Sequence, residues 1–270
     1  MMTDEFSAFD IIEGDPASGI VLLCDHARNW LPEEYGSLGL PESEFERHIA
    51  YDIGAANLTL ALAQRLGVPA VMSRFSRLLI DPNRGTDDPT VIMRLSDGTV
   101  VPGNHPIAED EIMKRIELFH APYHMAIARV VSQAIESGNL PIVFSIHSFT
   151  PAWKGVPRKW HAGFLWDADP RITDFMLERL SCDKNLVVGN NEPYDGALKN
   201  DTMYIHATQH GLPHTLVEVR NDLIANELGV EEWADRLASL LEEANARSDM
   251  HEVRYYGSRT DEPGATGEHL

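Results

Sequence analysis

Polar side chains able to bind a metal or move a proton follow apolar runs that the sequence predicts as buried strands. They are Asp25 and His26 after 19–24, His147 and Ser148 after 139–146, and Glu218 and Arg220 at the end of 214–220. Ligands of open α/β sheets bind outside the carboxyl ends of the strands, so we expect these side chains to meet at one edge. Two imidazoles and a carboxylate can hold a divalent metal, and a further carboxylate can take the proton of an activated water. The pattern therefore indicates the chemistry of a zinc hydrolase.

Each of these residues also has a simpler structural interpretation. A histidine at a strand end is often a hydrogen-bonded cap and not a metal ligand. Glu218 stands between Val217 and Val219 and could be a buried carboxylate paired with Arg220. As a general base, Glu218 would gain from the same burial, because burial raises a carboxyl pKa toward the working pH. Both interpretations of Glu218 remain open at this point.

The chain has twelve histidines, and most of the others are poorer candidates for a metal site. His120 and His124 have helical spacing, but Pro122 between them distorts the turn. A second series with four-residue spacing, at 206, 210 and 214, is interrupted by glycine and proline and predicts a turn. His48 is a possible substitute ligand, although it lies on the polar face of a predicted helix.

The elements that must position these residues alternate between strands and helices. Strands are predicted at 19–26, 68–73, 77–81, 139–147, 164–167, 185–190 and 214–220. Helices are predicted at 49–66, 109–135 with a kink or break at Pro122, 170–181 and around 233–244. This alternation predicts a single α/β domain over residues 1–256 with a mostly parallel or mixed central sheet, followed by a disordered tail at 257–270. The stretch 149–160 is predicted as a loop, a candidate lid, whose basic residues Lys154, Arg158 and Lys159 are solvated.

Composition limits the partners that the protein can have. Twenty-two basic and 42 acidic residues give a net charge of −20, which disfavours nucleic acid and anionic membrane surfaces. An anionic substrate therefore needs a local cationic pocket. Cys24 and Cys182 are predicted as reduced core residues, and no signal-peptide or membrane-spanning pattern is visible. These features lead us to expect a cytoplasmic protein whose oligomeric state the sequence does not reveal.

A set of ordered motifs resembles the N-formylglutamate amidohydrolase family, in particular the branch known as predicted N-formylglutamate amidohydrolases. The motifs are LCDHARNWLPEE, HIAYDIGA, SRFSRLLIDPNR, APYH, IHSFTP, NNEPYDG and HGLPHTLVEVR, which lie between residues 22 and about 225. Any one of them is weak, but the ordered set is specific. The resemblance implies a three-layer α/β sandwich of the phosphorylase/hydrolase-like type, similar to zinc carboxypeptidases.

The resemblance also implies a metal site made of His26, Asp52 and His147, with Glu218 as the general base. Asp52 comes at a helix start, where an N-cap is the alternative interpretation. Asp25 could orient a metal-binding residue without itself binding the metal. Asn29 occupies the place where carboxypeptidase-like sites have a carboxylate, which is a departure from the wider pattern.

The predicted cationic pocket lies in the run SRFSRLLIDPNR. Arg77 and Arg84 match arginines of the family and are expected, with Asn83, to hold a substrate carboxylate. The alternative is an Arg77–Asp81 or Arg84–Asp87 ion pair that only shapes the loop. The further substrate-binding candidates are Tyr123, His124 and Arg220.

Together these features predict a metal-dependent amidohydrolase with Zn²⁺, or another divalent metal, as its cofactor. The substrate would be a small carboxylate-bearing molecule, an N-formyl or N-acyl amide of an acidic amino acid such as N-formylglutamate, in amino-acid metabolism that includes histidine degradation. Two alternatives remain: the same site cleaving a different amide or an ester, and an inactive relative that only binds a metabolite.

Overall fold

The computed structural model describes residues 7–261 and is built around a seven-stranded sheet. The strand order is β1-β3-β2-β6-β11-β9-β10. The strands are β1 Phe9–Ile12, β2 Ile20–Cys24, β3 Ala70–Ser73, β6 Ile142–Phe149, β9 Ala162–Leu165, β10 Val188–Asn190 and β11 His214–Arg220. Neighbouring strands are parallel except for two pairs, β1 with β3 and β11 with β9. The prediction of a mostly parallel, mixed sheet is confirmed.

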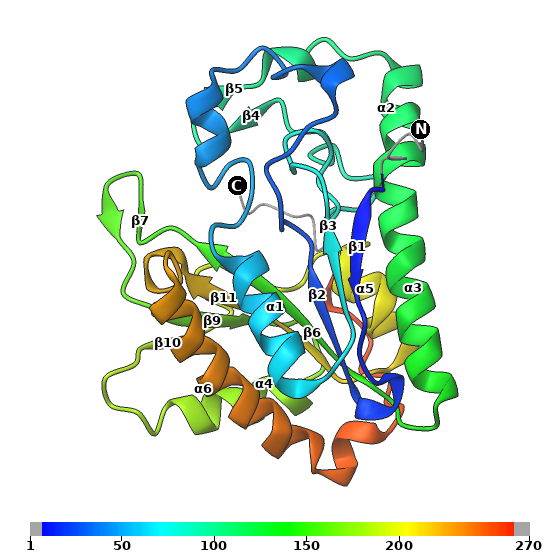
Figure 1. Ribbon diagram of the computed structural model, residues 1–270, viewed down its shortest axis with the longest axis vertical. Helices are drawn as coiled ribbons and strands as arrows, with labels where there is room; N and C mark the ends of the chain where they lie inside the picture. Colours follow the sequence, from blue (N-terminus) through cyan, green and yellow to red (C-terminus); the bar gives the residue numbers. More distant parts are fainter. Residues whose placement is uncertain (1–6, 262–270) are drawn as a thin grey trace.

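Helices cover both faces of the sheet and make a three-layer structure (Figure 1). They are α1 Ala55–Leu66, α2 Glu109–Arg115, α3 Ala121–Glu136, α4 Arg171–Leu180, α5 Thr202–His206 and α6 Glu227–Asn245. The interior strand β2 is buried on both sides, because Leu22 packs with α1 and α6 while Leu23 packs with α3. A fully apolar strand such as this belongs in the middle of a two-sided sheet.

The apolar run 77–81 is not a strand, contrary to the sequence prediction. Leu78 and Leu79 are fully buried, but their carbonyls accept hydrogen bonds from the side chains of Asn104 and Arg115 at 2.7 and 2.9 Å. The backbone is thus satisfied by distant side chains and needs no neighbouring strand. The predicted helix 49–66 is also shorter than expected and begins only at Ala55.

The long helical segment 109–136 is continuous in direction but changes its winding. Between α2 and α3 lies a π-helical turn, Ile116–His120, and Pro122 follows in the first turn of α3. Proline has no N–H to donate to the carbonyl of residue 118, so a wider turn is accommodated there. The disturbance predicted at Pro122 is therefore a local π-turn.

The long connections contain two small hairpins. They are β4 Leu95–Ser96 with β5 Thr99–Val100, and β7 Ala152–Trp153 with β8 Val156–Pro157. The second hairpin lies in the stretch predicted as an irregular loop. Cys24 is buried as expected, whereas Cys182 is exposed and not a core residue.

At the end of the described chain, Arg259–Asp261 forms a short 3-10 helix, and Arg259 pairs with Asp195. The rest of the tail predicted as disordered, 262–270, lies outside the described residues. None of the helices within residues 7–261 has the length and hydropathy needed to cross a membrane.

Candidate metal centre

Three neighbouring strands bring the predicted site residues together. β2 and β6 are parallel with Leu23 beside Ser145, so the residues that follow β2 lie next to His147. On the other side of β6, Glu218 of β11 is the register partner of His147. His147 lies within β6, which continues to Phe149, and not after its end as the sequence suggested.

Asp52 reaches the same place from the segment that leads into α1. Its backbone N–H donates to the carbonyl of His26 at 2.9 Å, which fixes the segment against the end of β2. Gly54 is the N-cap of α1 with a φ of 84°, and a Cβ there would lie 2.3 Å from the carbonyl oxygen of Ile224. Asp52 is therefore not the helix cap, and its carboxylate is free to face the two histidines.

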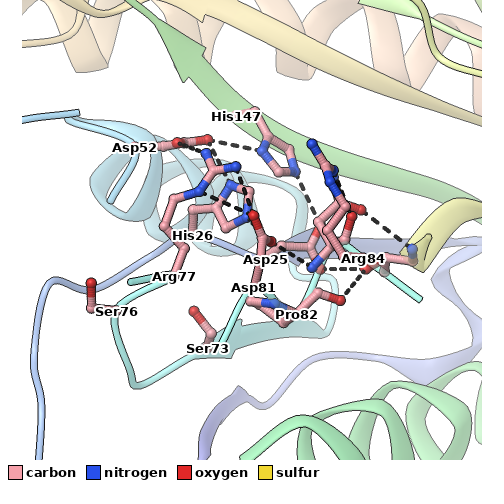
Figure 2. Close-up of polar contacts among 12 residues, drawn as sticks. Asp25, His26, Asp52, Ser73, Ser76, Arg77, Asp81, Pro82, Arg84 and His147 are labelled. Carbon is pink, nitrogen blue, oxygen red and sulfur yellow. Dashed lines mark hydrogen bonds and ion pairs between the residues drawn. The ribbon is translucent and has the colours of Figure 1, made fainter. Parts of the chain in front are cut away.

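His26, Asp52 and His147 form one buried cluster at the carboxyl end of the sheet (Figure 2). Asp52 Oδ2 lies 2.8 Å from His147 Nδ1 and 3.4 Å from His26 Nδ1. One ligand atom from each residue can be chosen so that all lie within 4.8 Å of one another. This is the arrangement that the sequence predicted for a metal site.

The other ring nitrogen of each histidine is bound by a buried carboxylate. His26 Nε2 donates to Asp81 Oδ1 at 2.6 Å, and His147 Nε2 donates to Asp25 Oδ2 at 3.0 Å. A carboxylate behind each imidazole fixes its tautomer and leaves Nδ1 as the ligand atom, as is usual for metal-binding histidines. Asp25 thus orients His147 across the sheet and not its neighbour His26.

Asp25 is itself held by donors from three elements. It accepts hydrogen bonds from Tyr123 Oη in α3, Ser145 Oγ in β6 and Thr202 Oγ1 in α5, at 2.9, 3.2 and 2.8 Å. Burial alone would raise the pKa of Asp25, but its contacts with His147 outweigh burial and lower the pKa to about 2. Asp25 is an anion at any physiological pH.

The donor set fits a divalent cation. With both Nε2–H groups donated to carboxylates, two Nδ1 lone pairs and a carboxylate oxygen of Asp52 converge, and they repel one another unless positive charge lies among them. Burial disfavours a charged His147, yet Asp25 and Asp52 raise its pKa to about 10. Positive charge is therefore favoured at this position, and imidazole nitrogen with carboxylate oxygen is a ligand set that zinc-type ions accept.

Glu218 faces this cluster without being part of it. Its Oε2 atom is buried and has no hydrogen-bond partner among the described residues. Burial and the negative charge of Asp52 raise the pKa of Glu218 to about 7. Arg220 pairs with Asp222 at 2.7 Å, so the alternative interpretation of Glu218 as its ion-pair partner is wrong.

The two predicted arginines differ in their partners. Arg77 donates to Asp81 at 2.7 Å and lies 3.6 Å from Asp52, so the ion pair considered from sequence is present. Arg84 donates to the carbonyl of Asn83 at 2.8 Å and makes no ion pair with any described residue. Asn83 is buried, and its side-chain oxygen accepts from the backbone N–H of Thr202 at 3.3 Å.

The remaining candidates lie behind or beside the cluster. Tyr123 is fully buried beneath Asp25, which favours a supporting role over contact with substrate. His124 donates to the carbonyl of Pro82 at 2.9 Å and accepts from His206 at 2.8 Å. His48 lies outside the cluster, 3.5 Å from Asp97.

Sequence reasoning missed the contribution of Asp81, which it treated only as a possible partner of Arg77. The signal was present, since Asp81 belongs to the same ordered motif as Arg77 and Arg84. Its contact with His26 joins residues 55 positions apart, which no local spacing reveals. Arg158 was predicted to be solvated, but it is half-buried and lies over the rings of Phe149 and Tyr194.

The protein has a mixed α/β sheet with the His26, Asp52 and His147 cluster at the carboxyl ends of its strands. This arrangement places it among α/β proteins with a candidate metal centre. The family model of N-formylglutamate amidohydrolase matches residues 18–225, and the chain belongs to that family. It is therefore a hydrolase that acts on carbon–nitrogen bonds other than peptide bonds.

Two solved structures are similar to this one. A gene product of Agrobacterium tumefaciens has a TM-score of 0.83 and 32% identity, with 88% of this chain and 95% of that chain covered. An N-formylglutamate amidohydrolase from Ralstonia eutropha JMP134 has a TM-score of 0.65 and 21% identity, with 89% and 97% covered, and shows the shared fold. A search of curated proteins finds no match.

Proposed function

We propose that this protein hydrolyses the N-formyl amide of an acidic amino acid, such as N-formylglutamate, with a zinc ion held by His26, Asp52 and His147. The observation that carries the proposal is the convergence of both Nδ1 atoms on Asp52 Oδ2, beside the unpartnered Oε2 of Glu218. A bound divalent metal supplies Lewis-acid activation of the amide carbonyl and of a water molecule.

The chain's own residues then hold the parts and move the proton. Glu218 accepts a proton from the attacking water through Oε2 and donates it to the leaving amine nitrogen. A pKa near 7 suits both steps, because the group can gain and lose a proton at neutral pH. Asp81 and Asp25 keep the two imidazoles in the orientation that the metal requires. The products are formate and the free amino acid.

Substrate binding is assigned to the predicted polar set around the Asp81 loop. Arg84 is the better of the two arginines for a substrate carboxylate, because Arg77 already lies between Asp81 and Asp52. In this proposal Arg77 acts by positioning those two carboxylates, and Asn83 with His124 shapes the loop that carries Arg84. Tyr123 supports Asp25 from below, and Arg220 holds the carbonyls at the end of the 149–160 segment.

The direct test measures metal content by mass spectrometry and formate release from N-formylglutamate by the purified protein. We expect His26→Ala to lose both bound metal and activity. Glu218→Gln should keep the metal but lose about 10²- to 10⁴-fold in kcat, since it removes only the proton transfer. A metal-free wild-type enzyme with full activity, or an active His26→Ala variant, would contradict the mechanism.

The same assay separates the two alternatives. A panel of N-acyl amino acids and esters identifies a different substrate if one of them is cleaved faster than N-formylglutamate. Binding of N-formylglutamate by the metal-loaded protein with no turnover of any panel member would indicate a binding module.

Two broader assignments belong to the same proposal. The three-layer architecture and the His/carboxylate/His cluster support a relationship to the zinc carboxypeptidase-like folds. Free Cys24 and Cys182 support a reducing, cytoplasmic location.

A further inference from the structure

Arg158 is unusual among the arginines of this acidic protein. Of the arginines in residues 7–261 that are buried or half-buried, all are ion-paired except Arg84 and Arg158. A half-buried cation without a counter-ion is costly, and it needs compensation from its surroundings. In a chain with a net charge of −20, the two uncompensated guanidinium groups mark where an anion can be received.

The Arg158 guanidinium lies in a cage of aromatic rings. Its Cζ atom is 5.5 Å from the ring centre of Phe149, 5.4 Å from that of Trp153 and 5.0 Å from that of Tyr194. Nη2 donates to Tyr194 Oη at 2.9 Å, and Nη1 donates to Thr150 Oγ1 at 3.2 Å. These contacts fix the plane of the fork and use only part of its five N–H donors, which leaves donors for a carboxylate.

The cage adjoins the candidate metal centre. Phe149 follows His147 by two residues in β6, so both side chains lie on the same face, about 7 Å apart along the strand. Burial and then the negative charge of Glu218 raise the pKa of the Tyr194 hydroxyl, so Tyr194 is within electrostatic reach of the proposed base. Arg158 contacts both rings, so it lies beside the edge of the candidate centre.

We infer that Arg158 binds the side-chain carboxylate of the substrate and makes the enzyme specific for N-formyl amino acids with an acidic side chain. The inference rests on the proposed function and adds the residue that selects the substrate. The other cations near this segment are less suitable, since Lys154 and Lys159 are exposed and Arg220 is paired with Asp222. Arg84 lies in the Asp81 loop close to the ligands and takes the carboxylate next to the scissile amide.

The test compares two substrates that differ only in the terminal group, N-formylglutamate and N-formylglutamine. Arg158→Gln should lower kcat/KM for N-formylglutamate by about 10- to 100-fold, mainly through KM, because a charge-assisted pair is lost. The kcat/KM for N-formylglutamine should stay nearly unchanged. Lys159→Gln, which removes one positive charge from the adjacent exposed position, should change neither value.

An equal loss for both substrates, or no loss for either, would overturn the inference. Arg158→Lys keeps the charge without the planar fork and serves as a second variant; it should retain an intermediate preference for the acidic substrate. Melting temperatures of all variants show whether each one is folded.

The inference can also fail separately from the proposed function. If the wild-type enzyme cleaves no N-formyl substrate, the proposed function is wrong, and titration calorimetry with glutarate then tests Arg158 alone. The carboxylate subsite is supported if the wild type binds glutarate and Arg158→Gln binds it with an affinity at least about 10-fold lower. Equal binding by both proteins, or none by the wild type, overturns it.

Discussion

Both candidate metal-binding histidines use their ring nitrogens in the same way. Nδ1 faces Asp52, and Nε2 donates to a buried carboxylate, Asp81 for His26 and Asp25 for His147. Asp25 follows β2 and Asp81 lies in the irregular segment after β3, so the same pair of contacts is made twice from unrelated parts of the chain. This repetition is easier to explain by a metal than by two independent structural histidines.

Replacing Asp81 tests this arrangement at the level of one contact. Asp81→Asn keeps the size of the side chain but removes the anion that orients His26, and it should weaken zinc affinity by about 10- to 100-fold. Competition with a chromophoric chelator measures that affinity. Added zinc should restore much of the lost activity.

A control for this variant exists in the same loop. Asp87 is exposed and, within residues 7–261, its side chain accepts only from Asn200, so Asp87→Asn should leave zinc affinity unchanged. Equal affinities in all three proteins would show that Asp81 does not act on the metal.

The site residues with a visible local pattern were predictable, and those defined by distant contacts were not. His26, Asp52, His147 and Glu218 each occur in a distinctive motif, and the structure brings them together. The contacts of Asp81 with His26 and of Arg158 with Tyr194 join segments that are far apart in the sequence. The residues around each of these positions do not predict such contacts.

At the level of elements, predictions succeeded where burial and backbone pairing coincide. The run 214–220 is a strand with the predicted bounds, because it is apolar and pairs with strands on both sides. The run 77–81 is as apolar but pairs with no strand of the described part of the chain, and Asn104 and Arg115 bind the carbonyls of Leu78 and Leu79 instead. Hydrophobic pattern reports burial, and it does not report which partner satisfies the backbone.

Helices α3 and α5 contact each other through imidazoles, which makes their contact sensitive to acid. His206 donates to His124 in the neutral state, and burial lowers the pKa of His124 to about 4 and that of His206 to about 3. The unfolded chain binds these protons at about pH 6.5, so the stabilisation is complete above that pH and is lost as the pH falls toward 3.

His206→Gln tests this coupling because glutamine keeps the donor but does not titrate. Between about pH 6 and pH 4 the free energy of unfolding of the variant should fall less steeply than that of the wild type. The two slopes should differ by about 1.4 kcal/mol per pH unit, the contribution of one titrating histidine. Urea unfolding at several pH values measures the slope. Parallel slopes for the two proteins would contradict the prediction.

Helix α6 is stabilised by its buried face against α1. Leu237 is fully buried there, so Leu237→Ala should lower the free energy of unfolding by about 2–5 kcal/mol. Leu228 lies in the first turn of the same helix and is 83% exposed, so Leu228→Ala should change the free energy of unfolding by less than about 0.5 kcal/mol. Chemical denaturation of both variants gives the comparison.

For the whole molecule, a metal in the candidate centre would join three segments that are far apart in sequence, at residues 26, 52 and 147. Ligand binding stabilises the native state by about 4 kcal/mol at a thousandfold excess over Kd. Zinc should therefore raise the melting temperature of the chelator-treated protein by roughly 8–16 °C for a domain of this size. Calorimetry measures the shift, and His26→Ala should abolish it.

The net charge of −20 has a different meaning once the arginines are located. Most of the buried or half-buried basic side chains in residues 7–261 are already neutralised by carboxylates, and the exceptions, Arg84 and Arg158, adjoin the candidate centre. An acidic surface therefore coexists with a site that receives an anion.

The support of Asp25 has a consequence for the order in which the site can be assembled. Its donors come from residues 98, 120 and 177 positions further along the chain, the last of them Thr202 in α5. A nascent chain that stops short of Thr202 therefore contains all three proposed metal ligands but not the complete support of His147. The centre becomes fully formed only when nearly the whole domain has been synthesised and folded, so an incomplete chain presents the ligands without a competent metal site.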